Sequence, residues 1–359
     1  MLRLAAGFAD KGADVEVVTL RSGGPLKSEI RSGVRHVPLG ASRASRAVPR
    51  LARYIGVRRP HAVIATLPHV NTIASVAHRL AGAKATLVLR EANDPAREHA
   101  FSGPVGVARA RFVRWAYARA DVIVALTHGN ADGVIRLLGV RPERVVVIPN
   151  PAPELATGSL TGAGTNAPPS GDPATESLLD LGAPAGDPRI LCVARLVPQK
   201  DHMTLLEAFE RFRQRYPGAV LAFVGDGPER ARLVERARQL RVEDGLFFAG
   251  MVADVAPWWR WADLFVLSSR WEGFPNVLLE ALAHGVSIVA TDCPTGPREV
   301  LDDGRAGVLV PIGDAAALSR GMEEAFVHPP AEEVLRARTH HYAFAAVLER
   351  WWGIVERPG

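Results

Sequence analysis

The stretch from Leu264 to Val300 reads LFVLSSRWEGFPNVLLEALAHGVSIVATDCPTGPREV, and its pattern predicts strand, loop, helix, strand and loop in turn. Leu264–Leu267 and Val286–Ala290 are short apolar runs of the kind that form buried strands. Leucines recur at helical spacing between them, from Pro275, which suits the first position of a helix, to a terminating glycine at Gly285. Strands that alternate with helices in this way indicate an α/β fold with a parallel sheet.

Two carboxylates eight residues apart belong to this stretch. Glu272 follows the first strand directly, and Glu280 lies about one and a half turns into the helix. Ligands of open α/β sheets bind in the crevice outside the carboxyl ends of the strands. We therefore expect both carboxylates to face one crevice, although such residues can also be surface acids that flank a core helix.

The residues around these carboxylates resemble a known signature. Glu272-Gly273-Phe274-Pro275-Asn276, with Glu280, the run GVSIVATD and a later Gly296 and Glu299, is similar to the E-x7-E region of retaining glycosyltransferase family four. The resemblance implies the GT-B fold class, in which two Rossmann-like doubly wound parallel-sheet domains face a cleft. It also implies transfer of a sugar from a nucleotide diphosphate donor without a metal. Bacterial members that move hexose or N-acetylhexosamine onto undecaprenyl-diphosphate sugars are the most similar.

Length and composition agree with a globular chain of two domains. The chain has 359 residues, of which 48% are hydrophobic. It contains no apolar run of the ~18–20 residues that a membrane span needs, and its start lacks the pattern of a signal peptide. The two cysteines, Cys192 and Cys293, lie beside predicted strands, which favours buried thiols over a disulfide. We expect a cytoplasmic protein, or a peripheral one on the inner face of the plasma membrane.

The charge is distributed unevenly along the chain. Residues 1–150 hold 23 basic and 10 acidic residues, whereas residues 151–359 hold 20 and 28. A basic half predicts an anionic partner, and no nucleic-acid motif accompanies it. A stripe of arginines at helical spacing could bind an anionic membrane surface or could simply be solvated; it consists of Arg43, Arg46, Arg50 and Arg53.

The order of predicted elements divides the chain into four parts. Residues 1–150 alternate strands and helices and form the expected acceptor-binding domain, and residues 151–187 are a linker rich in Gly and Pro. Residues 188–328 repeat the alternation and form the expected nucleotide-sugar-binding domain. Residues 329–359 are expected to form helices that pack back on the first domain.

The first domain is expected to have a gap in its sheet. The chain opens in a helix over Leu2–Lys11, and its first strand begins only at Asp14. Family members begin with a strand and a glycine-rich loop before this helix, and that strand is central in the sheet. We therefore expect a truncated first domain, unpaired strand edges and a weakened approach to the donor diphosphate.

Two cations and one carboxylate are the predicted catalytic residues. Arg195 and Lys200 follow the predicted strand Ile190–Val193 in the run VARLVPQKD. The resemblance implies that they hold the donor diphosphate and stabilise the leaving nucleotide, and that Glu272 contacts the sugar hydroxyls. Most arginines and lysines are solvated surface residues, so either cation alone would indicate little.

Donor binding is expected from side chains and backbone of the second domain. The resemblance assigns the ribose hydroxyls to Glu280, and the base to backbone near Gly250–Val252. The glycines of Gly225-Asp226-Gly227 could equally form a tight turn without a ligand. The full set is Glu280, Gly273, Phe274, Pro275, Asn276, Val277, Gly225, Gly227, Met251 and Val252.

Acceptor-side residues are expected in the first domain. The run LVLREANDP places polar residues after a strand and resembles acceptor loops of a subfamily. The expected residues are Arg90, Glu91, Asn93, His69 and His128. No Asp-x-Asp pair and no metal-ligand spacing of histidines occur in the sequence, so no metal and no other cofactor is expected besides the UDP-sugar.

The sequence thus predicts a retaining, metal-independent glycosyltransferase that moves a hexose or N-acetylhexosamine from a UDP-sugar to a lipid-linked or saccharide acceptor in cell-surface glycan synthesis. Two alternatives stay open. One is a nucleotide-sugar-binding subunit with impaired catalysis, and the other is a nucleotide-sugar epimerase of the same architecture.

Overall fold

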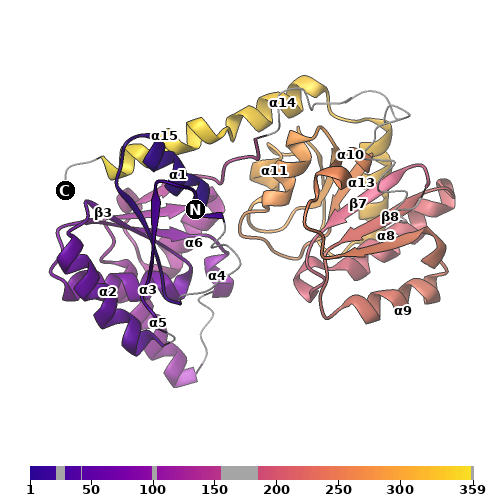
Figure 1. Cartoon of the computed structure of the whole chain (residues 1–359). Helices are drawn as coiled ribbons and strands as arrows, with labels where there is room; N and C mark the ends of the chain where they lie inside the picture. The colour runs from indigo at the N-terminus through magenta and orange to yellow at the C-terminus, as the bar shows by residue number, and fades with distance from the viewer. Residues whose placement is uncertain (22–28, 42, 99–102, 155–184, 357–359) are drawn as a thin grey trace. The chain divides into compact units, whose positions relative to one another are not determined.

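The computed structural model describes residues 1–21, 29–41, 43–98, 103–154 and 185–356, and these form two compact units (Figure 1). Unit 1 consists of Met1–Pro149 and Ala345–Gly359, and unit 2 consists of Asn150–Phe344. Most of the expected linker, residues 155–184, lies outside the described residues. No helix in the described ranges combines the length and apolar character needed to cross a bilayer.

Unit 2 is built on a six-stranded sheet in which every neighbouring pair is parallel, in the order β12-β11-β10-β7-β8-β9. The strands are β7 (Arg189–Val193), β8 (Val220–Val224), β9 (Leu246–Gly250), β10 (Leu264–Leu267), β11 (Ser287–Thr291) and β12 (Val308–Val310). Strands β8, β10 and β11 are buried throughout, as expected where helices cover both faces of a sheet. The strand order reverses at β7 and β10, so their carboxyl ends form the switch point at which such sheets bind ligands.

Helices cover this sheet and carry its core. They are α8 (His202–Arg215), α9 (Arg230–Leu240), α10 (Ala256–Trp261), α11 (Asn276–Ala283), α12 (Pro297–Val300), α13 (Ala315–Val327) and α14 (Glu332–His341). Short 3-10 turns occur as η3 (Pro198–Lys200) and η4 (Glu243–Gly245). Apolar residues of α8 and α13, including Phe209 and Met322, pack with strand residues such as Leu221 in one buried cluster.

Unit 1 contains two smaller parallel sheets. Strands β3 (Ala62–Thr66), β4 (Thr86–Glu91), β5 (Val122–Ala125) and β6 (Val145–Val147) form one, and β1 (Val15–Thr19) pairs with β2 (Val34–Pro38) in the other. The helices are α1 (Leu2–Asp10), α2 (Ala44–Arg58), α3 (Pro68–Leu80), α4 (Pro95–Glu98), α5 (Gly103–Tyr117), α6 (His128–Leu138) and α15 (Phe344–Val355), with the turn η2 (Pro142–Arg144). Within the described residues no ladder joins the two sheets.

The last two helices belong to different units. Helix α15 packs on unit 1, where Trp352 lies 5.9 Å from the ring of Phe8 and Glu349 pairs with Lys11 at 2.7 Å (Figure 1). Helix α14 instead packs against α11 of unit 2. The expected segment 329–359 is therefore divided near Phe344, because the buried Leu335 and Tyr342 bind α14 to unit 2.

Candidate active site

An ion pair between a buried carboxylate and a half-buried lysine lies at the switch point of unit 2. Lys200 ends the turn that follows β7, and its Nζ donates to Oε1 of Glu272 at 2.5 Å. Glu272 follows β10, is 6% exposed and also accepts from Ser269 Oγ at 2.6 Å. Because β7 and β10 are neighbours, the topology brings together two residues that are 72 positions apart in the chain. Two of the three predicted catalytic residues thus touch each other directly.

The two loops that carry this pair are fastened to each other by further hydrogen bonds. Gln199 Nε2 donates to the carbonyl oxygen of Trp271 at 2.8 Å, and Ser268 Oγ donates to the carbonyl oxygen of Lys200 at 2.7 Å. The backbone N–H of Arg270 donates to Gln199 O at 2.9 Å. These bonds fix where Lys200 and Glu272 can lie, which is the support that a preorganised site needs. The sequence contains one signal for them, a pair of serines directly after a strand.

Arg195 is exposed just after β7, at the same edge of the sheet. The two glycines predicted beside it have a packing role. A Cβ on Gly225 would lie 2.1 Å from the carbonyl oxygen of Ala194, and one on Gly227 would lie 2.4 Å from that of Leu196. Only glycine permits the β8–α9 turn to approach the Arg195 loop so closely, so both residues are accounted for by a tight turn alone.

The segment between Glu272 and α11 packs tightly. The helix begins at Asn276, so Pro275 is its N-cap and not the predicted first helical residue. The Phe274 ring is buried and meets the ring of Tyr342 edge-on at 6.1 Å. Val277 is half-buried, and Gly273 precedes the turn. A Cβ at Gly296, where φ is +98°, would lie 2.4 Å from Pro275 Cδ, so this glycine is required for the contact.

Glu280 lies on α11 and is half-buried. Burial raises the pKa of its carboxyl above the ordinary value of 4.5, although a hydrogen bond with the Trp259 side chain acts in the opposite direction. Met251 and Val252 follow β9 at the edge of the sheet, and Met251 is 79% exposed. The exposure of Met251 leaves this part of the backbone open to a ligand.

Unit 1 gathers the acceptor-side residues along one edge. His69 and Arg90 lie at the carboxyl ends of β3 and β4, and His128 begins α6 after β5. Parallel pairing of β3, β4 and β5 puts these ends side by side. Both histidines are exposed, and burial lowers the pKa of Arg90 to about 10. Arg90 donates to Thr66 Oγ1 at 3.0 Å.

Glu91 differs from the expectation for an acceptor contact, whereas the assignment of Asn93 stays a prediction. Glu91 is fully buried and accepts from the hydroxyl of Tyr117 at 2.6 Å. Asn71 Nδ2 in turn donates to that hydroxyl at 3.0 Å and to Arg90 O at 3.1 Å. Glu91 therefore supports the end of β4 from inside and has no surface for an acceptor, whereas Asn93 is exposed and bonded to Glu98.

Among the described residues, no three side chains of His, Cys, Asp or Glu gather in a way that could hold a metal ion. Cys192 and Cys293 are both buried free thiols. Burial is the largest cause that raises the pKa of each to about 12, so both thiols stay protonated.

Comparisons with known proteins extend over both units. Residues 1–151 match the glycosyl transferase 4-like domain, and residues 187–327 match the family described as glycosyl transferases group 1. The lipopolysaccharide core biosynthesis glycosyltransferase LpsE of Rhizobium meliloti is 36% identical over 160 residues, which are 45% of this chain and 46% of that protein. An N-acetylgalactosaminyltransferase of Campylobacter jejuni that acts on a diphospho-undecaprenol-linked sugar is 25% identical over 253 residues, 70% of this chain and 63% of that one. The chain thus spans about half the length of the relatives it matches.

A solved structure shows the same fold. Anabaena HepE, crystallised with UDP and glucose, superposes with a TM-score of 0.76 at 19% identity, covering 98% of this chain and 93% of HepE. Its likeness extends to both Rossmann-like units, and the two family matches cover the same two parts of the sequence. The two parts of the chain thus match two glycosyltransferase domain families, the 4-like domain over residues 1–151 and group 1 over residues 187–327, and the chain is a glycosyltransferase with the GT-B fold.

Proposed function

We propose that the protein transfers a hexose or N-acetylhexosamine from a UDP-sugar, with retention of configuration and without a metal, to a lipid-linked or saccharide acceptor in bacterial glycan synthesis. The observation that carries this proposal is the Lys200–Glu272 ion pair at the β7/β10 switch point. Support for the donor comes from HepE, which binds UDP and glucose, and support for the acceptor comes from the Campylobacter relative and its diphospho-undecaprenol substrate.

The residues at the switch point suit a departing diphosphate. Lys200 has three N–H donors and Arg195 has a planar fork, so together they can bind several phosphate oxygens. Helix α11 begins at Asn276, and the positive end of its dipole favours an anion. In many enzymes, most of the rate enhancement comes from preorganised charges aimed at the group that becomes negative in the transition state. This constellation lowers the barrier for loss of the nucleotide.

Lys200 must change partner when the donor binds. Its Nζ bonds Glu272 in the structure, and the two side chains are 16% and 7% exposed. A diphosphate beside Lys200 takes over part of its hydrogen bonding, which frees Glu272 to accept from sugar hydroxyls while Ser269 still holds it. Glu280 is assigned to the ribose hydroxyls, since a partly desolvated carboxylate bonds strongly to neutral donors.

The proton from the acceptor hydroxyl goes to the leaving phosphate in this proposal. Glu91 is buried against Tyr117 and is not used as a base. His69, His128 and Arg90, at the edge of unit 1, bind the acceptor and its diphosphate instead. The step forms the bond from the acceptor oxygen to the anomeric carbon and breaks the bond from that carbon to the UDP oxygen.

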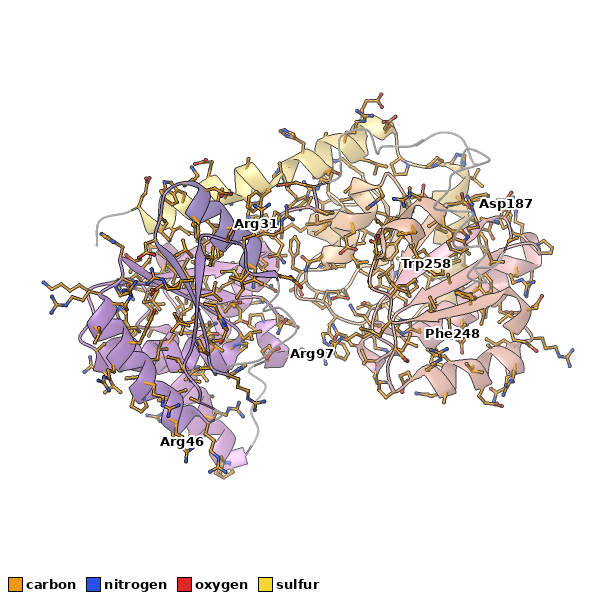
Figure 2. The ribbon with its side chains drawn as sticks, viewed as in Figure 1. Arg31, Arg46, Arg97, Asp187, Phe248 and Trp258 are labelled. Carbon is orange, nitrogen blue, oxygen red and sulfur yellow. The ribbon has the colours of Figure 1, made fainter. Side chains whose placement is uncertain are left out.

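A lipid-linked acceptor requires a protein that meets an anionic membrane surface. Helices α2, α3 and α5 contain no aspartate or glutamate, and α3 packs against both of the others. The four stripe arginines are exposed, Arg43 as the N-cap of α2 and the other three on the helix. Arg46 extends from α2 in Figure 2, and Arg50 also donates to Leu39 O at 2.8 Å. We assign this layer to the lipid surface.

Helix α5 adds apolar side chains to the same layer. Val105 is 83%, Val107 60% and Phe112 48% exposed, although the aromatic spacing of the segment favours a core-facing helix. Its inner face does pack, through Val113 and Tyr117. Exposed apolar residues among arginines are typical of helices that lie in a membrane interface.

The experiment that tests the function combines binding and turnover. Calorimetry with UDP, GDP and ADP should show preferential binding of UDP, and a labelled UDP-hexose or UDP-N-acetylhexosamine should give a glycosylated lipid diphosphate. Glu272→Gln should lower turnover at least about 100-fold, since a neutral amide replaces the carboxylate that accepts from the sugar hydroxyls and holds Lys200, a loss of ~3 kcal/mol of transition-state stabilisation. Its melting temperature should stay within a few degrees, because Gln keeps the bond from Ser269. UDP binding without turnover by the wild type would favour the binding-subunit alternative, and wild-type turnover by Glu272→Gln would contradict the assignment.

A further inference from the structure

The two segments where the chain passes between its units meet inside unit 2. Unit 2 begins at Asn150 and ends at Phe344. Two residues after its beginning, the N–H of Ala152 donates to the carbonyl oxygen of Tyr342 at 2.8 Å. Ala152 is 4% exposed and Tyr342 is 2% exposed. The incoming and outgoing segments are therefore bonded to each other in a buried place.

Both segments also contact the residues that lead into α11. From the incoming segment, Asn150 Nδ2 donates to Oδ1 of Asn276, the first residue of the helix, at 2.7 Å. From the outgoing segment, the Tyr342 ring meets the Phe274 ring edge-on at 6.1 Å and an interplanar angle of 70°. Phe274, Pro275 and Asn276 are thus held from two sides by chain that has just left, or is about to enter, unit 1.

A third attachment runs through α14. Arg338 Nε donates to the carbonyl oxygen of Val300 at 2.8 Å, and its Nη2 donates to the hydroxyl of Tyr342 at 2.8 Å and to the carbonyl oxygen of Glu299. Burial raises the pKa of Tyr342 to about 12, so the phenol stays neutral and can accept this bond. Helix α12, which contains Val300, is therefore also hydrogen-bonded to the outgoing segment.

We propose that Asn150 and Tyr342 are positioning residues of the donor site, which couple its Phe274–Asn276 segment to the two connections between the units. This inference rests on the proposed function, in which the same segment binds sugar and phosphate. Neither residue touches the donor; each acts through Asn276 or Phe274. Coupling between two parts of a protein is reciprocal. If donor binding shifts the conformational equilibrium of the connections by some factor, a change in the connections alters donor affinity by the same factor.

The Asn150–Asn276 bond can be tested with matched variants and UDP as the probe. Asn150→Ala should weaken UDP binding by about fivefold, the effect of one net hydrogen bond. Asn276→Ala should do the same, and the double variant should be no weaker than either single one. Asn150→Gln should keep more UDP affinity than Asn150→Ala, because its neutral amide can still donate to Asn276. Gln214→Ala, which removes an exposed amide bond of 2.9 Å to Glu210, is the control and should change nothing.

Tyr342 has its own pair of variants. Tyr342→Phe keeps the ring against Phe274 and should retain most UDP affinity, whereas Tyr342→Leu removes the aromatic contact and should lose several-fold. A residue that only stabilises the fold would lower the melting temperature without this pattern.

Hydrogen exchange without nucleotide separates this inference from the proposed function. Peptides covering residues 273–283 should exchange faster in Asn150→Ala than in the wild type and Gln214→Ala. If the wild type fails to bind UDP, the proposed function is wrong, and the exchange result alone decides on the coupling. Two results would overturn the coupling. One is a wild type that binds UDP and an Asn150→Ala variant that binds it equally well; the other is unchanged hydrogen exchange over residues 273–283 in Asn150→Ala.

Discussion

Single residues at the switch point show which parts of the site can be predicted from the local sequence and which cannot. Glu272 and Lys200 were predicted because each follows an apolar strand and resembles a family position, and the structure joins them at 2.5 Å. Asn150 was not predicted, because its partner lies 126 positions away along the chain, and Ser269 was not predicted although Glu272 is only three positions away, because no local pattern shows that its hydroxyl turns toward that carboxylate. The burial of Glu91 was missed for a similar reason, since Tyr117 comes from a separate helix.

Glu280 gives a prediction for the dependence of stability on pH. Burial raises its pKa in the folded protein above the ordinary value of 4.5. Its contribution to stability is therefore fully present below pH 4.5 and is lost as the pH rises through the folded-state pKa. Glu280→Gln, which can still accept from Trp259, should match the wild-type melting temperature near about pH 4 and exceed it near about pH 7. Thermal melts across this range check the sign, and the same variant should bind UDP more weakly. A wild type that gains stability over Glu280→Gln as the pH rises would contradict the shift.

The order of the helices and strands along the chain could be predicted from apolar periodicity. The residues at which each element begins and ends, and the face that each helix exposes, could not. Helix α11 starts one residue later than its proline suggested, because Pro275 is held as the N-cap against Gly296. Helix α5 contains three aromatic residues that follow one another closely, Phe112, Trp115 and Tyr117. Which of them is buried depends on the neighbouring helices, and of these three only Tyr117 is fully covered.

The β8–α9 turn gives a prediction about stability. Gly227→Ala should destabilise unit 2 by about 1–3 kcal/mol, since its Cβ meets a backbone carbonyl that cannot move without displacing the Arg195 loop. Gly353→Ala is the matched control, because a Cβ there meets nothing within 4 Å and the residue lies inside α15. The control should be neutral or stabilise by up to about 1 kcal/mol. Denaturant unfolding of both variants measures the difference, and equal stabilities would refute the packing role.

The basic layer of unit 1 gives a prediction about lipid binding. Changing Arg43, Arg46, Arg50 and Arg53 to Gln should weaken binding to anionic vesicles about tenfold or more, since each arginine near an anionic leaflet contributes about 1 kcal/mol. Changing Val105, Val107 and Phe112 to Ser should weaken it as well, and the residual binding should be more sensitive to salt. Ile312→Ser with Val334→Ser removes exposed apolar residues from unit 2 and serves as the control. If all variants co-sediment with anionic vesicles to the same extent as the wild type, this layer does not bind the lipid surface.

Over the full length of the chain, alternation of strands and helices predicted two sheet-based units, and the structure has them. The path of the chain between them was less predictable. Tyr342 and Leu335 bind α14 to unit 2, whereas Trp351 and Trp352 bind α15 to unit 1, and no local pattern distinguishes the two helices. The coupling of both connections to Asn276 and Phe274 likewise depends on tertiary contacts alone.

The proposed activity of the molecule depends above all on Lys200, which stabilises a departing UDP without the help of a metal. The decisive experiment is the determination of kcat/KM for sugar transfer from a UDP-sugar to a lipid-linked acceptor in the presence of EDTA, for the wild type and for Lys200→Ala. We expect EDTA to leave wild-type turnover unchanged and Lys200→Ala to lose at least about 100-fold, the equivalent of ~3 kcal/mol of transition-state stabilisation. Turnover by Lys200→Ala at the wild-type rate, or a wild-type activity that EDTA abolishes and Mg²⁺ or Mn²⁺ restores, would show that the leaving group is stabilised in another way.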